Sequence, residues 1–164
     1  MLNIPNLQEI IKNAFTEDVG DGDHSTLACI PDTQSGAAKL LVKEEGILAG
    51  VALAKEIFSF YDPRLEMEIF LEDGSPIKPG DVAFIVRGPE RSLLTTERLV
   101  LNFMQRLSGI ATQTAKYVKM LENTPTKVLD TRKTTPGLRH LEKWAVTLGG
   151  GMNHRIGLYD AFLI

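Results

Sequence analysis

A long amphipathic helical pattern is the feature that most constrains how this chain can fold. From Thr95 to Leu121 the buried-type side chains recur at steps of three and four, at Leu99, Phe103, Leu107, Ile110, Thr114, Val118 and Leu121. This spacing places them on one face of an α-helix. Glu97 lies in the predicted first turn, where the helix dipole favours an acid, and the Ser108-Gly109 pair is a candidate kink or division. A helix of this length joins two parts of a molecule.

The residues before this helix predict a small unit of mixed helices and strands. Strand-like runs cover 37–43, 65–71 and 81–87, and helical spacing covers 7–15 and 53–60. Asn6 and Glu9, three residues apart, predict a capping box for the first helix. Residues 17–26 are polar and rich in glycine, which predicts a loop.

The residues after the long helix predict the first βα units of a parallel α/β barrel. A strand is expected at 127–130, a loop at 131–134, and a helix capped by Thr135 with Pro136 at its first position. Its buried stripe is Leu138, Leu141, Ala145 and Leu148, and three glycines at 149–151 end it. A second strand begins at 161 and the sequence stops at 164. We therefore expect an α/β protein: an α+β, sandwich-like domain at 1–110, and an incomplete, truncated barrel at 111–164.

Charge is divided unevenly along the chain. Of the 164 residues, those up to Glu122 carry 12 Lys and Arg against 18 Asp and Glu, a net charge of −6, whereas the remainder carry 6 against 3, a net of +3. The basic end is a candidate anion site, with a solvated basic surface as the alternative. It is too small and too poor in aromatic residues for a nucleic-acid surface.

The composition and the N-terminus favour a cytoplasmic protein without a membrane partner. No window reaches the roughly 20 apolar residues of a membrane span, and the first ten residues lack a signal-peptide pattern. Cys29, the single cysteine, has no internal disulfide partner, which fits a reducing compartment. We expect Cys29 to be a small buried side chain.

Two short segments are the strongest candidates for chemistry. They are Thr131-Arg132-Lys133-Thr134 and Asn153-His154-Arg155, both in loops next to predicted strands. Arginine pairs bidentately with carboxylate or phosphate, so this set favours binding of two anionic groups. No nucleophile adjoins a base and no close pair of acids is present, which argues against covalent catalysis and hydrolysis. The alternatives are surface ion pairs for the cations and a structural hydrogen bond for His154.

Two other segments are weaker candidates. The acids near His24 lack the spacing of a calcium loop, so a structural turn is favoured over a metal site. The turn-rich residues 74–82 are similar to the corners of lipoyl-like carrier domains. Lys78, however, precedes a proline in a turn and not at a hairpin tip.

Several runs of residues together resemble the quinolinate phosphoribosyltransferase family, also called nicotinate-nucleotide pyrophosphorylase (carboxylating). The longest run is Asp-Thr-Arg-Lys-Thr-Thr-Pro-Gly-Leu-Arg at 130–139, followed by the glycines at 149–151 and by Asn153-His154-Arg155. Shorter runs are at 17–23, 96–102 and 107–112. The resemblance covers nearly the whole chain and corresponds to the N-terminal portion of the family.

The resemblance implies a pentosyltransferase of NAD biosynthesis. Such an enzyme transfers phosphoribose from phosphoribosyl pyrophosphate to quinolinate, with Mg²⁺, and releases pyrophosphate and carbon dioxide; a related transferase with another acceptor is the alternative. It implies a substrate site formed by Arg132, Lys133, Thr134, His154 and Arg155, with Lys133 as an electrostatic catalyst. It also implies a homodimer in which Arg98 reaches the neighbouring active site. No metal ligand is assigned within the sequence, since those of the family are expected beyond residue 164.

Overall fold

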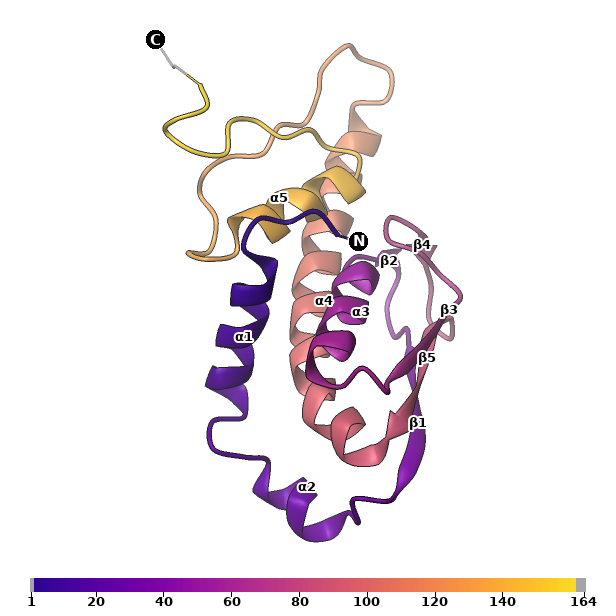
Figure 1. The fold of residues 1–164 in the computed structure, drawn as a ribbon. Helices are drawn as coiled ribbons and strands as arrows, with labels where there is room; N and C mark the ends of the chain where they lie inside the picture. Colours follow the sequence, from indigo (N-terminus) through magenta and orange to yellow (C-terminus); the bar gives the residue numbers. More distant parts are fainter. Residues whose placement is uncertain (1, 162–164) are drawn as a thin grey trace.

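The computed structural model describes residues 2–161 and confirms a mixed α/β fold (Figure 1). The helices are α1 (Leu7–Asp18), α2 (His24–Cys29), α3 (Val51–Tyr61), α4 (Glu90–Met120) and α5 (Arg139–Leu148). The strands are β1 (Ser35–Leu41), β2 (Gly46–Ile47), β3 (Glu66–Ile69), β4 (Pro76–Ile77) and β5 (Val82–Pro89). None of these helices combines the length and the hydropathy that a membrane crossing requires.

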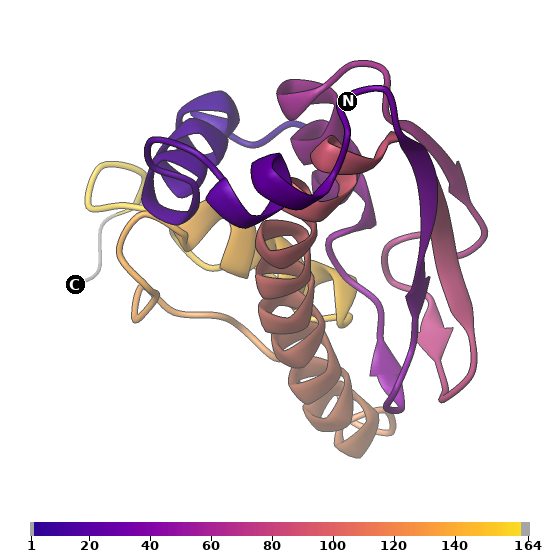
Figure 2. The same ribbon diagram turned by 90° about the horizontal axis from the view of Figure 1, so that it is seen from below.

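The strands form two antiparallel sheets on one side of α4. The larger has the order β1-β5-β3, and β2 pairs with β4. In Figure 2 the strands lie to the right of α4, α1 lies to its left, and α5 crosses behind it. The three longer predicted strands are thus confirmed, within a few residues at their ends.

Helix α4 is a single helix of 31 residues, about 46 Å long at 1.5 Å per residue. It begins at Glu90, five residues before the predicted start, so Glu90 and not Glu97 is the acid of its first turn. It continues through Ser108 and Gly109 without a break, so the expected division is absent. The proposed domain boundary at 110/111 lies inside this helix and stays a prediction.

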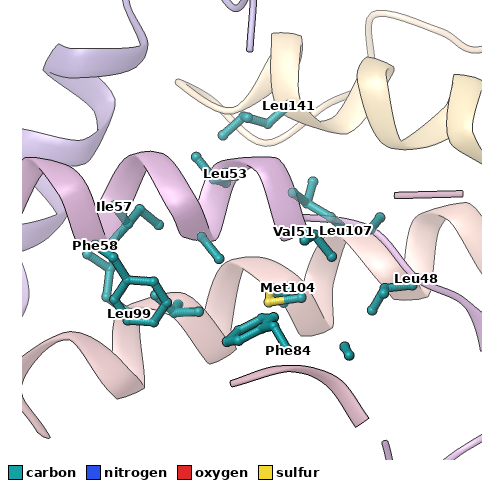
Figure 3. Close-up of a cluster of buried hydrophobic side chains, with 14 of the residues drawn as sticks. Leu48, Val51, Leu53, Ile57, Phe58, Phe84, Leu99, Met104, Leu107 and Leu141 are labelled. Carbon is teal, nitrogen blue, oxygen red and sulfur yellow. The ribbon is translucent and has the colours of Figure 1, made fainter. Parts of the chain in front are cut away.

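One hydrophobic core joins both parts of the chain. Buried side chains from α3, β5, α4 and α5 belong to the same cluster. Leu141 of α5 faces Leu53 of α3, and Phe84 of β5 lies beside Met104 of α4 (Figure 3). The position of α5, and of the loops on either side of it, is therefore fixed by the same core as the sheet.

Three predictions for the N-terminal segment are wrong. Asn6 has φ 57°, and its side chain makes no capping hydrogen bond, so there is no capping box. The predicted loop at 17–26 is partly helical, because α1 continues to Asp18 and α2 begins at His24; the Asp23 carboxylate caps α2 by accepting from the Thr26 N–H (3.1 Å). Cys29 is exposed and not buried.

Two predictions for the C-terminal segment are also wrong. Helix α5 begins at Arg139 and not after Thr135, because Gly137 has φ 81°, outside the range of an α-helix. The expected strand at 127–130 is reduced to one parallel bridge between Leu129 and Met152. The last expected strand, 161–164, falls mostly outside the described residues, and Ala161 is not in a strand.

The three consecutive glycines after α5 are required by packing as well as by chain reversal. A Cβ on Gly149 would lie 2.3 Å from the Ala111 carbonyl oxygen, and one on Gly151 would lie 2.9 Å from the Thr114 side chain. Gly150 has φ 85°. The end of α5 therefore approaches the α4 backbone more closely than any residue with a Cβ allows.

Candidate functional site

The two candidate loops leave neighbouring, parallel segments at the same end of the molecule. The Asp130 N–H donates to the Met152 carbonyl (3.1 Å), and the Met152 N–H donates to the Val128 carbonyl (2.9 Å). Loop 131–134 follows the first segment, and loop 153–155 follows the second. The structure thus brings the two loops together, near the end of α4 where the orange and yellow segments of Figure 1 meet.

A buried ion pair lies beneath both loops. Lys143 of α5 and Asp130 are only 2% and 5% exposed, and the Lys143 ammonium donates to Asp130 Oδ1. The same oxygen accepts the backbone N–H of His154 (2.8 Å), and the Lys143 ammonium also donates to the His154 carbonyl (3.1 Å). The carboxylate that precedes one loop therefore holds the backbone of the other.

A second residue of α5 connects the loops directly. The Arg139 guanidinium donates from Nε to Thr134 Oγ1 (3.1 Å) and from Nη1 to the Ile156 carbonyl (3.1 Å). Thr134, one of the predicted substrate-binding residues, is thus oriented by Arg139.

A third group ties the first loop to α4. Glu142 accepts from Arg106 Nε (2.8 Å) and from the Thr135 N–H (3.2 Å), while Arg106 Nη2 donates to Thr135 Oγ1 (2.5 Å). Burial of Glu142 disfavours its charge, but the hydrogen bonds from Arg106 and Thr135 outweigh burial and hold the pKa of Glu142 below its usual range. Glu142 is therefore an ionised structural carboxylate whose charge is balanced by Arg106.

The predicted substrate-binding cations, in contrast, form no direct ion pair within the described residues, although the charge of Arg155 also acts on Asp160. The side chains of Arg132, Lys133, His154 and Arg155 form no ion pair there, and Arg132 Nε is buried without a hydrogen-bond acceptor. Lys133 and His154 are exposed, and Arg132 and Arg155 are half-buried. A buried, unpartnered guanidinium N–H is costly, so an anionic ligand is the acceptor that this geometry favours.

Carboxylates near the loops are all engaged elsewhere. Asp130 pairs with Lys143, Glu142 pairs with Arg106, and Asp160 accepts the backbone N–H groups of Ile156 (2.6 Å) and Gly157 (3.0 Å). These two backbone hydrogen bonds lower the pKa of Asp160. The loops are left with a net positive charge.

This donor set does not suit Mg²⁺, which prefers several free oxygen ligands. Within residues 2–161 there is no cluster of three acidic, histidine or cysteine side chains that could hold a metal ion. The residues described here therefore fit the anions of a substrate and not the metal.

Arg98 is not part of this arrangement within the chain. It is exposed on α4, eight residues before Arg106, which is a separation of about 12 Å along the helix axis. Arg106 is the α4 residue that hydrogen-bonds to the Thr135 end of the first loop. The structure brings five of the six predicted residues together and leaves Arg98 apart.

Two of the cavities in the structure border α4. One of about 650 Å³ separates the β1–β2 connection from α4, and one of about 430 Å³ lies between α1, α4 and residues 136–138. Neither is lined by residues of loops 131–134 or 153–155.

Sequence reasoning assigned no role to the residues that hold the loops. Arg139, Glu142 and Lys143 occupy positions i, i+3 and i+4 of α5 and so share one helix face. That spacing is the signal the sequence offers, but the apolar stripe predicted for the same helix lies on another part of its surface. Asp130 and Arg106 could be found only once the loops were known to be adjacent.

Comparison with known proteins agrees with this geometry. The family model "Quinolinate phosphoribosyl transferase, N-terminal domain" matches residues 23–108, and the corresponding C-terminal domain matches 110–164. A probable nicotinate-nucleotide pyrophosphorylase (carboxylating) of Bacillus subtilis is 45% identical over 99% of this chain and 56% of its own length. Quinolinate phosphoribosyltransferase (decarboxylating) 1 of Nicotiana glauca is 47% identical over 96% of this chain and 45% of its own.

Solved structures show the same similarity. NadC from Streptococcus pyogenes superposes with a TM-score of 0.91 at 43% identity, over 95% of this chain and 56% of that one. The nicotinate-nucleotide pyrophosphorylase from Francisella tularensis gives 0.92 at 40% identity, over 99% and 59%. The chain spans about half the length of the curated relatives it matches. Loops, charges and similarity over nearly its whole length all agree, and the chain belongs to the quinolinate phosphoribosyltransferase family.

Proposed function

We propose that this chain carries part of the active site of an enzyme that transfers phosphoribose from phosphoribosyl pyrophosphate to quinolinate. The observation that supports this most directly is the unequal pairing of charges at the two loops. Arg132, Lys133, His154 and Arg155 form no direct ion pair among the described residues, whereas Asp130 and Glu142 are ion-paired and Asp160 accepts backbone N–H groups. Both substrates are polyanions, and such a surface suits them.

The chemistry requires positioning more than acid–base catalysis. The quinolinate ring nitrogen forms a bond to the anomeric ribose carbon as the bond from that carbon to the pyrophosphate oxygen breaks. Carbon dioxide then leaves from the carboxylate next to the nitrogen, and a proton replaces it, which gives nicotinate mononucleotide. Arginine forks suit the two adjacent carboxylates of quinolinate, and Lys133 is placed to stabilise the departing pyrophosphate electrostatically.

The proposal includes Mg²⁺ as the counter-ion of the pyrophosphate group. Because the carboxylates near the two loops are engaged in ion pairs or backbone hydrogen bonds and form no cluster of three within residues 2–161, its protein ligands are proposed to come from residues other than those described.

The proposal also includes a homodimer of cytoplasmic subunits with shared active sites. Arg98 is exposed and lies about 12 Å along α4 from the contact between Arg106 and the first loop. In the proposed dimer, Arg98 of one subunit completes the active site formed by the two loops of the other subunit.

Ligand-induced stabilisation tests the proposed function. Quinolinate should raise the melting temperature of the full-length wild-type protein, and the Arg155→Ala variant should lose most of this shift. Each charged hydrogen bond lost costs about 1.5–3 kcal/mol, which weakens binding roughly 10- to 150-fold.

Arg87→Ala is the matched control, because Arg87 is a half-exposed arginine paired with Glu68 in the sheet. It should keep the full shift. An Arg155→Ala variant that is stabilised as strongly as the wild type would contradict the site assignment. Turnover without release of carbon dioxide would point to another acceptor.

A further inference from the structure

The buried Asp130–Lys143 pair has no evident role in binding a ligand. Both side chains are at least 95% buried, and each already has its charge satisfied by the other. Burying an ion pair is a weak source of stability, because the loss of hydration offsets the attraction. The contacts that this pair makes with neighbouring backbone are therefore the better guide to its role.

Both polar groups of the His154 backbone form hydrogen bonds with this pair. Its N–H donates to Asp130 Oδ1 (2.8 Å), and its carbonyl accepts from the Lys143 ammonium (3.1 Å). The Asn153 side-chain amide, in the orientation that satisfies both of its polar atoms, donates to Asp130 Oδ2 (2.6 Å) and to the Lys143 carbonyl (2.9 Å). The start of the second loop is thus held by charged partners from two directions.

The same pair is connected to the first loop through the chain. Asp130 directly precedes Thr131-Arg132-Lys133, and its N–H is fixed by the Met152 carbonyl. The carboxylate that accepts the His154 N–H therefore also belongs to the segment from which Arg132 and Lys133 extend. This pair is therefore, together with Arg139, a point at which the spacing between the cations of the two loops is set.

We propose that Lys143, acting with Asp130, is a positioning residue that sets His154 and Arg155 against Arg132 and Lys133. This inference rests on the proposed function, because the geometry being set is that of the two-anion site. The Lys143 side chain is only 2% exposed, so its effect is transmitted through the backbone of His154.

A pair of variants separates positioning from stability. Lys143→Met alone leaves a buried, uncompensated carboxylate and should lower the melting temperature. The double variant Asp130→Asn/Lys143→Met removes both charges at nearly constant volume and should regain most of that stability. Its kcat/KM for quinolinate should remain about 100-fold below the wild type, the loss that a displacement of about 1 Å causes in an oriented reaction.

A spectroscopic measurement tests the same idea without catalysis. In the full-length protein, the His154 amide proton should resonate downfield and exchange slowly with solvent, since it donates to a carboxylate. Asp130→Asn, which conserves shape, and the double variant should both move this resonance upfield and speed its exchange.

The matched control is Asp62→Asn, which removes the charge of another buried, ion-paired carboxylate, at the end of α3. It should lower the melting temperature while leaving kcat/KM and the His154 amide resonance unchanged. A double variant with wild-type kcat/KM and an unmoved His154 resonance would overturn the inference. If the wild type itself does not turn over quinolinate, the proposed function fails, and the His154 resonance still decides whether Asp130 and Lys143 hold this backbone.

Discussion

Lysine and arginine side chains near the two loops divide into two groups by their partners. Lys143 and Arg106 are paired with Asp130 and Glu142, whereas Lys133 has no acidic partner in the described structure. A cation paired with a buried carboxylate fixes the local backbone, and an unpaired, exposed cation remains available to a ligand. Substituting a member of the first group should therefore disturb folding first, and a member of the second group should disturb binding first.

Asp62 provides a pH-dependent test of such pairing away from the loops. Arg64 donates to its carboxylate through Nε (2.9 Å) and Nη2 (2.7 Å), and the Ser92 hydroxyl donates to it at 2.6 Å. The Arg64 hydrogen bond, opposed by burial and supported by Ser92, holds the pKa of Asp62 far below its usual 3.8. The ionised form is thus favoured by folding.

Because the folded-state pKa is lowered, this contribution to stability is present above about pH 3.8 and is lost as the pH falls below it. Asp62→Asn should reduce the free energy of unfolding by about 2 kcal/mol at pH 7, the value of a charged hydrogen bond. The difference between wild type and variant should shrink at pH 3. Urea unfolding at pH 7, 5 and 3 measures it, and a difference independent of pH would argue against the assigned cause.

The site could be predicted from sequence only where the residues themselves carry the signal. Arg132, Lys133, Thr134, His154 and Arg155 were predicted because they lie in two short, distinctive runs. Their supports were not, because each depends on adjacency in space. Asp130 and Lys143 are 13 positions apart and meet only after α5 has packed on the core.

Helix α5 is positioned by the absence of side chains at its end. Gly149 lies against the backbone of α4, where a Cβ would be 2.3 Å from the Ala111 carbonyl oxygen and 2.7 Å from Thr114. Any substitution must push α5 away from α4. Because Arg139, Glu142 and Lys143 all extend from α5, both loops would move with it.

Two glycine substitutions should consequently have opposite effects. Gly149→Ala should destabilise the protein by about 1–3 kcal/mol through overpacking. Gly109→Ala is the matched control: Gly109 lies inside α4 with nothing within 4 Å of a new Cβ, and alanine there should stabilise by about 0.5–1 kcal/mol. Thermal and urea unfolding measure both, and equal losses in the two variants would refute the packing argument.

Elements in which apolar residues recur at a regular spacing were predicted well. Elements whose start depends on the φ angle of a single residue were not. The spacing of Leu99, Leu107 and their neighbours fixed α4 to within a few residues, apart from its first turn. Thr135-Pro136 has the composition of a helix start, but the positive φ of Gly137 delays the helix to Arg139. The Lys127 to Asp130 run has strand character, yet only Leu129 has a bridge partner in the described chain.

The arrangement of the whole molecule makes the proposed shared site testable by mixing subunits. In the proposed dimer, each site combines Arg155 of one subunit with Arg98 of the other. A dimer of an Arg98→Ala subunit with an Arg155→Ala subunit would therefore contain one site with both substitutions and one with neither. Random pairing of equal amounts should restore about a quarter of the wild-type sites in a two-fold symmetric dimer. Each variant alone should be nearly inactive.

Activity is to be measured after co-refolding the two full-length variants and, as a control, after refolding each with itself. Recovery in the mixture alone supports exchange of Arg98 between subunits. Equally low activity in all three samples would place Arg98 in its own subunit's site, and an active Arg98→Ala variant would place it outside any site.

Helix α4 also constrains how this chain can change in length. Arg98, Arg106 and Ala111, which Gly149 contacts, all lie on one uninterrupted helix. A single inserted residue between positions 98 and 106 would rotate Arg98 by about 100° about the helix axis and shift it by about 1.5 Å relative to α5. Related chains should therefore tolerate insertions in the turns around Gly74, Gly80 or Glu122, while α4 keeps a constant residue count between these contacts.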